Sequence, residues 1–211
     1  MRRLPDLRLM LVTDAAMTAR RGLIATVREA VAGGVTVVQL RDKDASDADM
    51  VALARALRKE LAPRGVPLIV NDRPDVAAAA EADGVHIGQE DGDPCAARRL
   101  LGPDAILGLS VTDAAEVATV DPAVVDYVGL GPAFATATKA DAALPLGLDG
   151  FRAVGAMLPV PFVAIGGIDA ENAGAIMAAG ASGIAVVSAI CAAEDPRAAA
   201  MALRAAMQAT T

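Results

Sequence analysis

The chain has 211 residues, of which 55% are hydrophobic and 2% aromatic, and its formal net charge is −7. This composition predicts one globular domain, residues 1–211, with a sizeable buried core. It argues against a nucleic-acid-binding protein, which would present a basic face and stacking rings.

The sequence gives no sign of export or of membrane attachment. The charged start at Arg2 and Arg3 is followed by Pro5 and not by a long apolar region, so no signal peptide is expected. No uninterrupted apolar stretch reaches about 18 residues, so no transmembrane helix is expected. Cys95 and Cys191 lack a CxxC neighbour, which is typical of reduced cysteines in the cytoplasm.

Short apolar runs alternate with Ala-rich amphipathic segments along the whole chain. The runs predict strands at Leu7–Thr13, Val35–Leu40, Leu68–Asn71, Gly84–Ile87, Ile106–Ser110, Tyr127–Gly131, Pro161–Ile165 and Gly183–Val187. The segments after them predict helices at Gly22–Ala32, Ser46–Leu61, Arg73–Glu81, Pro94–Leu101, Asp113–Val120, Leu148–Met157, Asn172–Ala179 and Pro196–Met207. This α/β order predicts a (β/α)8 TIM barrel at its small end. An open doubly wound sheet is the alternative, because strand count alone does not prove closure.

A basic cluster follows the second predicted strand. Alternate side chains of an extended strand share a face, so Gln39, Arg41 and Lys43 are expected on one side where the buried strand meets its loop. One amide and two cations suit a polyanionic ligand. A solvated strand end is the alternative.

Polar residues also follow the other predicted strands. Asn71 and Asp72 end the third strand, Asp91 follows the fourth, Ser110 ends the fifth, and residues 136–139 follow the sixth. In a barrel these positions gather at the carboxyl-terminal face, where active sites of this fold lie.

Two carboxylates of this set suit a Mg²⁺ ion. Asp72 and Asp91 would lie beside the basic cluster, and Mg²⁺ favours few protein ligands together with substrate phosphate and water. Two other interpretations stay open: Asp72 could cap the helix that starts near Arg73, and Asp91 could lie in a solvated turn.

The last two strands end in features that suit a phosphate. Gly166-Gly167 lacks Cβ atoms, so its backbone can approach an anion near a helix N-terminus, and Ser188 after the eighth strand adds donors. The long segment Pro132–Leu146 predicts a functional flap that carries Thr136, Thr138 and Lys139. A disordered insertion is its alternative.

His86 is the only histidine, and it alternates away from its apolar neighbours. It could act as a general base, but a hydrogen-bonded structural histidine is the favoured interpretation. The sequence contains no GxSxG, Walker A or GxGxxG motif, so serine-hydrolase, P-loop and dinucleotide chemistry lack support.

Taken together, these motifs resemble the thiamine-phosphate synthase family. The matching segments are Gln39–Lys43, Val70–Asp72, Gly84–Asp91, Leu107–Ser110, Tyr127–Pro132, Thr136–Lys139, Ile165–Ile168 and Val187–Ile190, in the family's order. The resemblance implies a (β/α)8 transferase of thiamine biosynthesis. It would join 4-amino-5-hydroxymethyl-2-methylpyrimidine diphosphate to 4-methyl-5-(2-hydroxyethyl)thiazole phosphate, or to its carboxylated form, and release thiamine phosphate and pyrophosphate.

The resemblance also implies a role for each matching residue. Asp72 and Asp91 would hold Mg²⁺. The pyrimidine diphosphate would be held by Gln39, Arg41, Lys43, Asn71, Ser110 and Lys139, and the thiazole phosphate by Thr136, Thr138, Gly167, Val187 and Ser188. Leu40, Asp42 and Ala137 complete the predicted substrate-binding set, and the predicted catalytic residues are Arg41, Lys43, Ser110 and Lys139.

Three rival functions remain beside this one. A thiazole tautomerase of the same superfamily would lack the metal pair and place a His near Gly131-Pro132, where this sequence has none. A phosphosugar isomerase would explain only the Gly166-Gly167 cradle, and a non-catalytic phosphate-binding paralogue would use the same residues without turnover. Small-molecule substrates are the expected partners, and whether the chain forms a homo-oligomer is left open.

Overall fold

The computed structural model describes residues 4–136 and 143–208, and it forms a closed barrel of eight parallel strands in chain order. The strands are β1 (Leu9–Val12), β2 (Val37–Leu40), β3 (Leu68–Asn71), β4 (Gly84–Ile87), β5 (Ile106–Val111), β6 (Tyr127–Leu130), β7 (Phe162–Ile165) and β8 (Gly183–Val186). Closure is completed where β8 pairs with β1, with Leu11 opposite Val186. The predicted (β/α)8 barrel is therefore confirmed, and the open sheet is wrong.

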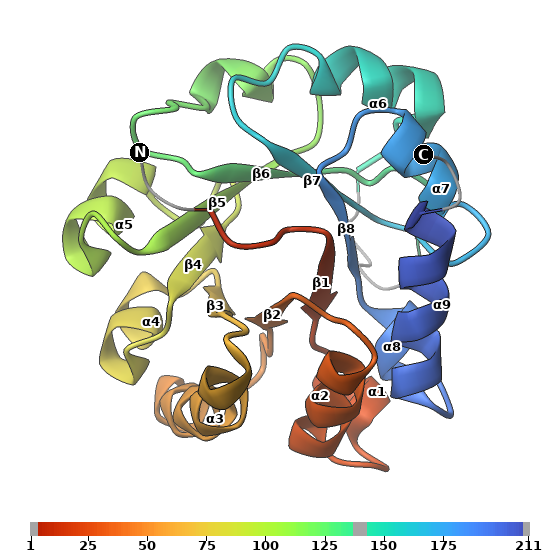
Figure 1. Cartoon of the computed structure of the whole chain (residues 1–211). Helices are drawn as coiled ribbons and strands as arrows, with labels where there is room; N and C mark the ends of the chain where they lie inside the picture. Colours follow the sequence, from red (N-terminus) through yellow and green to blue (C-terminus); the bar gives the residue numbers. More distant parts are fainter. Residues whose placement is uncertain (1–3, 137–142, 209–211) are drawn as a thin grey trace.

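Helices surround the ring of strands (Figure 1). They are α1 (Ala15–Thr18), α2 (Leu23–Ala32), α3 (Asp47–Leu61), α4 (Pro74–Ala80), α5 (Pro94–Leu101), α6 (Gly147–Gly155), α7 (Ala173–Ala178), α8 (Ser188–Cys191) and α9 (Pro196–Gln208). The described residues also form two short 3₁₀ helices, η1 (Ala62–Arg64) between α3 and β3 and η2 (Glu116–Thr119) between β5 and β6. Among the described helices, none is both long and apolar enough to cross a membrane.

Both faces of each strand are buried, which explains the continuous apolar runs in the sequence. In β1, Leu9 and Leu11 pack in the cluster shared with the helices, whereas Met10 and Val12 pack inside the barrel. The interior cluster is Leu7, Met10, Val12, Val37, Ile69, Tyr127, Val163 and Ala185.

The structure differs from the sequence prediction in four short elements, one of which is η1, directly after α3. The helix expected over Asp113–Val120 is only the 3₁₀ helix η2, although Asp113 accepts hydrogen bonds from the Ala115 and Glu116 amides as a helix cap would. The helices α1 and α8 have four residues each, too few for a recognisable apolar period.

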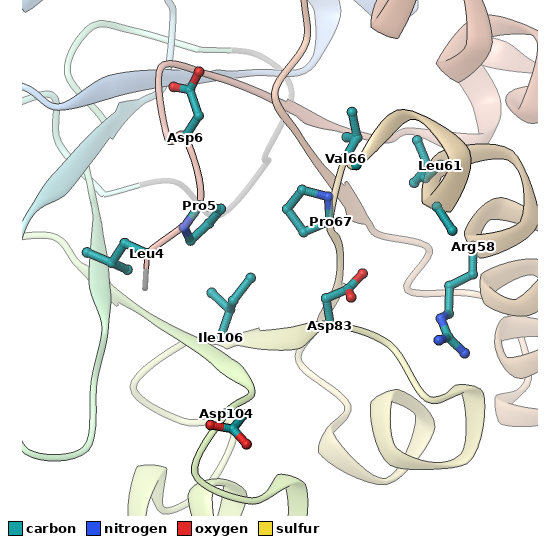
Figure 2. Close-up of a pocket in the computed structure, with 12 residues that line it drawn as sticks. Leu4, Pro5, Asp6, Arg58, Leu61, Val66, Pro67, Asp83, Asp104 and Ile106 are labelled. Atoms are coloured by element: carbon teal, nitrogen blue, oxygen red, sulfur yellow. The ribbon is translucent and has the colours of Figure 1, made fainter. Parts of the chain in front are cut away.

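A hollow of about 570 Å³ lies at the amino-terminal side of the barrel, lined by the end of α3 and by segments that lead into β1, β3, β4 and β5 (Figure 2). It contains none of the predicted site residues. One of its carboxylates, Asp83, accepts a hydrogen bond from the Leu68 amide at the start of β3 over 2.8 Å. That contact ties neighbouring strands together, so its role there is structural.

Candidate active site

A cavity of about 580 Å³ opens at the carboxyl-terminal face of the barrel. It brings together most of the described residues that the sequence assigned to the site, namely Gln39, Arg41, Lys43, Asn71, Asp72, Asp91, Ser110, Thr136, Gly167, Val187 and Ser188. Leu40 and Asp42 do not line it. Ala137, Thr138 and Lys139 lie outside the described residues.

The backbone of the basic cluster is fixed from the neighbouring strand. The Thr13 hydroxyl, just after β1, accepts a hydrogen bond from the Arg41 amide over 2.9 Å and donates one to the Arg41 carbonyl over 3.3 Å. The Leu40 side chain is fully buried in the cluster shared with the helices, so it faces away from the cavity. The alternation predicted for Gln39, Arg41 and Lys43 therefore directs these three side chains to the cavity.

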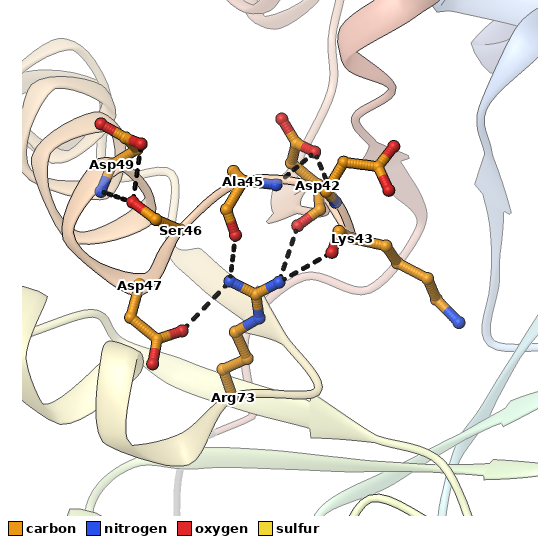
Figure 3. Close-up of polar contacts among 8 residues, drawn as sticks. Asp42, Lys43, Ala45, Ser46, Asp47, Asp49 and Arg73 are labelled. Atoms are coloured by element: carbon orange, nitrogen blue, oxygen red, sulfur yellow. Dashed lines mark hydrogen bonds and ion pairs between the residues drawn. The ribbon is translucent and has the colours of Figure 1, made fainter.

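Arg73 anchors the loop that carries Lys43 (Figure 3). Its guanidinium donates to the backbone carbonyls of Ala45 over 2.7 Å, Lys43 over 3.0 Å and Asp42 over 3.3 Å, and it pairs with Asp47. The Lys43 side chain extends away from Arg73, so its ammonium is not used to hold the loop. No sequence pattern indicated this role of Arg73.

The Asp42 carboxylate also shapes this loop. Its Oδ1 accepts hydrogen bonds from the amides of Asp44 over 3.1 Å and Ala45 over 3.2 Å. These bonds occupy the Asp42 carboxylate, and Asp42 does not line the cavity, so its side chain stabilises the turn of this loop. A contact with a substrate would therefore have to come from its backbone.

Asp72 and Asp91 meet at the edge of the cavity. Burial, a hydrogen bond with Asp91 and the Asp91 charge raise the pKa of Asp72 to about 6, although Lys43 and Arg41 act in the opposite direction. Asp72 has φ 62°, a left-handed conformation that is strained for a residue with a side chain and is often found at functional sites. Its amide is held by the His86 carbonyl at 2.8 Å.

The sequence left open that Asp72 caps a helix and that Asp91 lies in a solvated turn. The structure excludes the first interpretation and agrees with the second. The residue that caps α4 is Arg73, and no side chain caps this helix, so Asp72 is not its N-cap. Asp91 does lie in an exposed turn, in which its Oδ2 accepts a hydrogen bond from the Gly88 amide over 2.7 Å. That contact leaves the second oxygen of Asp91 for another ligand.

The carboxylate pair fits a Mg²⁺ ion. Two carboxylates in contact need a shared cation or a proton, and the pKa of Asp72 is raised first by burial and then by the neighbouring Asp91 carboxylate. Within the described residues, no group of three or more Cys, His, Asp and Glu side chains could form a metal cage. Two carboxylates supplemented by phosphate and water are a common arrangement for Mg²⁺.

His86 lies inside the barrel beneath the cavity. Its Nδ1 is 2.9 Å from the Tyr127 hydroxyl and its Nε2 is 3.0 Å from Ser110 Oγ. Burial lowers the pKa of His86 to about 4. These partners agree with the favoured prediction of a hydrogen-bonded structural histidine.

Further polar residues line the cavity without having been assigned to the site, among them Gln89, Glu90, Thr112 and Glu116. The Gln89 amide donates to the Ser110 carbonyl over 2.7 Å, and the Glu116 carboxylate accepts from the amide and the hydroxyl of Thr112 over 2.6 and 3.0 Å. The strand alternation that selected Ser110 would also have selected Thr112. Glu116 lies in the 3₁₀ helix η2 and not in a strand, so strand alternation could not select it.

The loops after β6 and β7 pack against each other on the opposite side of the cavity. The Phe134 amide donates to the Gly166 carbonyl over 3.0 Å, and the Asn172 side chain donates to the Gly167 carbonyl over 2.9 Å. Gly166 and Gly167 have φ values of 95° and 65°, which favour glycine. A Cβ at Gly167 would lie 2.5 Å from the Ala135 carbonyl oxygen, so this glycine permits the close contact of the two loops.

The lobe of the cavity that contains Gly167, Val187 and Ser188 is the one in which the sequence suggested a phosphate at a helix N-terminus. The helices beside this lobe are shorter than that suggestion requires. Strand β8 ends at Val186, and Ser188 is the first residue of the four-residue helix α8. Helix α7 begins only at Ala173 and has six residues. The donors of this lobe are therefore mainly loop amides and the Ser188 hydroxyl, with little helix-dipole field.

The fold and this cavity are typical of (β/α)8 enzymes that bind phosphorylated ligands at the carboxyl ends of their strands. A family model described as thiamine monophosphate synthase matches residues 9–190. The chain therefore belongs to the thiamine monophosphate synthase family, as the sequence motifs predicted.

Individual relatives agree with this assignment. The chain is 56% identical over 199 residues to a thiamine-phosphate synthase of Azorhizobium caulinodans, covering 94% of each chain. It is 51% identical to one of Chloroflexus aurantiacus, covering 97% of this chain and 94% of the relative. A solved thiamine phosphate pyrophosphorylase of Pyrococcus furiosus superposes with a TM-score of 0.88 at 36% identity, covering 97% of both chains.

Proposed function

We propose that this chain joins the pyrimidine diphosphate to the thiazole phosphate, or to its carboxylated form, to give thiamine phosphate and pyrophosphate. The observation that carries the proposal is the convergence of Arg41, Lys43, Asp72 and Asp91 at one edge of the cavity. Family membership supports the same reaction.

The diphosphate is assigned to the basic edge of the cavity. Arg41 and Lys43 supply cations, Asn71 and Ser110 supply an amide and a hydroxyl, and Lys139 belongs to this set by its sequence motif. Asp72 and Asp91 would hold Mg²⁺, which when bound neutralises charge on the diphosphate. In a chain of net charge −7, such a local cluster is what attracts a polyanion.

The thiazole phosphate is assigned to the opposite lobe. Gly167, Val187 and Ser188 line this side, with Thr136 beside them. Ala137 and Thr138 join this lobe by their sequence motif. Backbone amides and hydroxyls can hold a monophosphate without a full cation, so the two lobes are suited to different anions.

The reaction requires little acid–base catalysis by the protein. Pyrophosphate leaves a benzylic-type carbon, and the electron-rich aminopyrimidine stabilises the positive charge that remains on that carbon. The thiazole nitrogen then forms the new carbon–nitrogen bond. The residues of the cavity bind the leaving group, orient the thiazole and exclude water, which accounts for a site without a strong base or a nucleophile.

We also propose that the chain acts in the cytoplasm as a single catalytic domain. The two cysteines are unpaired, Cys191 is buried, and residues from all eight strands or their following loops line the cavity. Small molecules are its partners. Whether it works as a homo-oligomer can be measured by analytical ultracentrifugation.

The test of the reaction is pyrophosphate release from the purified protein. We expect release only when Mg²⁺ and both substrates are present, in amounts equal to the thiamine phosphate formed. Release without the thiazole phosphate, or binding of both substrates without release, would contradict the proposal. The second result would instead indicate a non-catalytic paralogue.

A further inference from the structure

A line of four hydrogen-bonded side chains crosses the barrel interior and ends at the cavity. The Tyr127 hydroxyl lies 2.9 Å from His86 Nδ1, and His86 Nε2 lies 3.0 Å from Ser110 Oγ. On the other side of the phenol, the Gln39 side chain is hydrogen-bonded to Tyr127. Gln39, His86 and Tyr127 are buried, and Ser110 is half-buried in the cavity wall.

Two inward-facing glycines make room for this line. A Cβ at Gly108 would lie 2.3 Å from His86 Nδ1 and 2.5 Å from the Tyr127 oxygen, and a Cβ at Gly129 would lie 2.9 Å from the imidazole Cε1. Gly108 sits opposite His86 in the β4–β5 register and opposite Tyr127 in the β5–β6 register. Any side chain at these positions would displace the imidazole or the phenol.

The direction of the hydrogen bonds depends on the tautomer of His86. A neutral imidazole has one N–H donor and one acceptor nitrogen, whereas serine and tyrosine hydroxyls can do both. His86 is buried, and burial disfavours the charged imidazolium. The groups at the two ends of the line therefore decide which nitrogen carries the hydrogen.

Both ends favour hydrogen on Nε2. Phosphate oxygens of a bound diphosphate only accept, so the Ser110 hydroxyl has to donate to them and its oxygen is free to accept from Nε2–H. Nδ1 then accepts from the Tyr127 hydroxyl, and the phenol oxygen accepts from the Gln39 amide. The Gln39 Nε2 also lies 3.6 Å from Met10 Sδ, a weak acceptor, which agrees with a donor facing this interior.

We propose that Tyr127 is a positioning residue that acts through His86 to direct the Ser110 hydroxyl toward the diphosphate. The inference rests on the proposed function, because the acceptor-only diphosphate fixes one end of the line. Each hydrogen stays on its own heavy atom, so no proton is transferred. With the opposite tautomer, Ser110 would donate to His86 and present only lone pairs to a polyanion.

A spectroscopic test is available because His86 is the only histidine in the chain. In protein labelled with ¹⁵N at the histidine ring, with Mg²⁺ and inorganic pyrophosphate added at pH 7, Nε2 is expected to carry hydrogen and Nδ1 to be bare. Tyr127→Phe removes the donor to Nδ1, so the second tautomer is expected to appear. Ile69→Val, in the same interior cluster, is the matched control and leaves the spectrum unchanged. Hydrogen on Nδ1 in the parent chain, or no response to Tyr127→Phe, would overturn the inference.

A kinetic cycle provides a second test with a different readout. Tyr127→Phe is expected to lower kcat/KM for the pyrimidine diphosphate about tenfold in the parent chain, but less than about twofold in a Ser110→Ala background. Equal factors in the two backgrounds would show that Tyr127 only packs the interior and would overturn the proposal. If the parent chain forms no thiamine phosphate at all, the proposed function fails, while the tautomer measurement still decides the direction of the line.

Discussion

The Arg73 guanidinium donates a hydrogen bond to the backbone carbonyl of Lys43 over 3.0 Å, so the residue after Asp72 holds the loop that carries a diphosphate cation. Arg73→Met removes this bond together with those to Asp42 and Ala45. We expect KM for the pyrimidine diphosphate to rise about tenfold, because the cation is no longer pre-positioned.

The matched control for this change is Arg55→Met. Like Arg73, Arg55 donates to a backbone carbonyl, that of Ala79 at 2.8 Å, but this bond joins α3 to α4, and neither residue lines the cavity. Steady-state kinetics of both variants separate loop positioning from general stability. Equal changes of KM in the two variants would count against the role assigned to Arg73.

Metal dependence is tested at Asp91. Asp91→Ala is expected to cut turnover at least about 100-fold, which corresponds to about 2.7 kcal/mol of transition-state stabilisation. Asp91→Asn keeps an oxygen that can accept from the Gly88 amide, but its turnover should fall by a similar factor, because the negative charge is what binds the metal. Asp93→Ala is the control: Asp93 caps α5 through the Cys95 and Ala96 amides, so its loss affects stability and not turnover. Full activity of Asp91→Ala in excess EDTA would contradict the metal assignment.

The sequence could predict a parallel α/β fold because most strands are apolar on both faces, as Leu9 and Met10 of β1 illustrate, and the eight repeated units favoured the barrel. Strand alternation also placed Gln39, Arg41 and Lys43 in the cavity. It could not identify Arg73, whose partners are carbonyls of a loop that is distant in sequence.

Two other features depend on tertiary contacts that a sequence pattern does not show. Gly167 was expected to make way for a phosphate, whereas its missing Cβ makes way for the Ala135 carbonyl. His86, Ser110 and Tyr127 come from the neighbouring strands β4, β5 and β6, and only the register of these strands brings their side chains together.

This revised view of Gly167 changes what a substitution there should do. Gly167→Val places a Cβ 2.5 Å from the Ala135 oxygen and 2.9 Å from Phe134 Cβ, so the loop that leads to Thr136 has to move. We expect KM for the thiazole phosphate to rise tenfold or more, roughly 1.4 kcal/mol. Gly65→Val is the control, because Gly65 has nearly the same φ, 64°, but no atom within 4 Å of its Cβ position. If both variants only lose stability and keep their KM values, the loop contact does not shape the site.

The lowered pKa of His86 predicts a pH-dependent loss of stability. The unfolded chain takes up a proton below pH 6.5, whereas the folded chain resists it until about pH 4 because of burial, despite a weaker opposing effect of the Asp91 charge. The native state is thus destabilised as the pH falls through this range, by about 3 kcal/mol in total. In His86→Gln this contribution is absent. The difference in the free energy of unfolding between this variant and the parent chain should therefore become smaller as the pH is lowered from 7 to 4.5. Urea unfolding at both pH values measures it, and parallel pH profiles would refute it.

The assignment of one anion to each lobe is tested most directly by isothermal titration calorimetry of two variants with two ligands. Lys43→Ala and Ser188→Ala are each titrated with the pyrimidine diphosphate and with the thiazole phosphate, in the presence of Mg²⁺. We predict that Lys43→Ala weakens binding of the diphosphate at least about tenfold and leaves the thiazole phosphate within about twofold, and that Ser188→Ala does the reverse. If each variant weakens both ligands equally, or if the two patterns are exchanged, the division of the cavity is wrong.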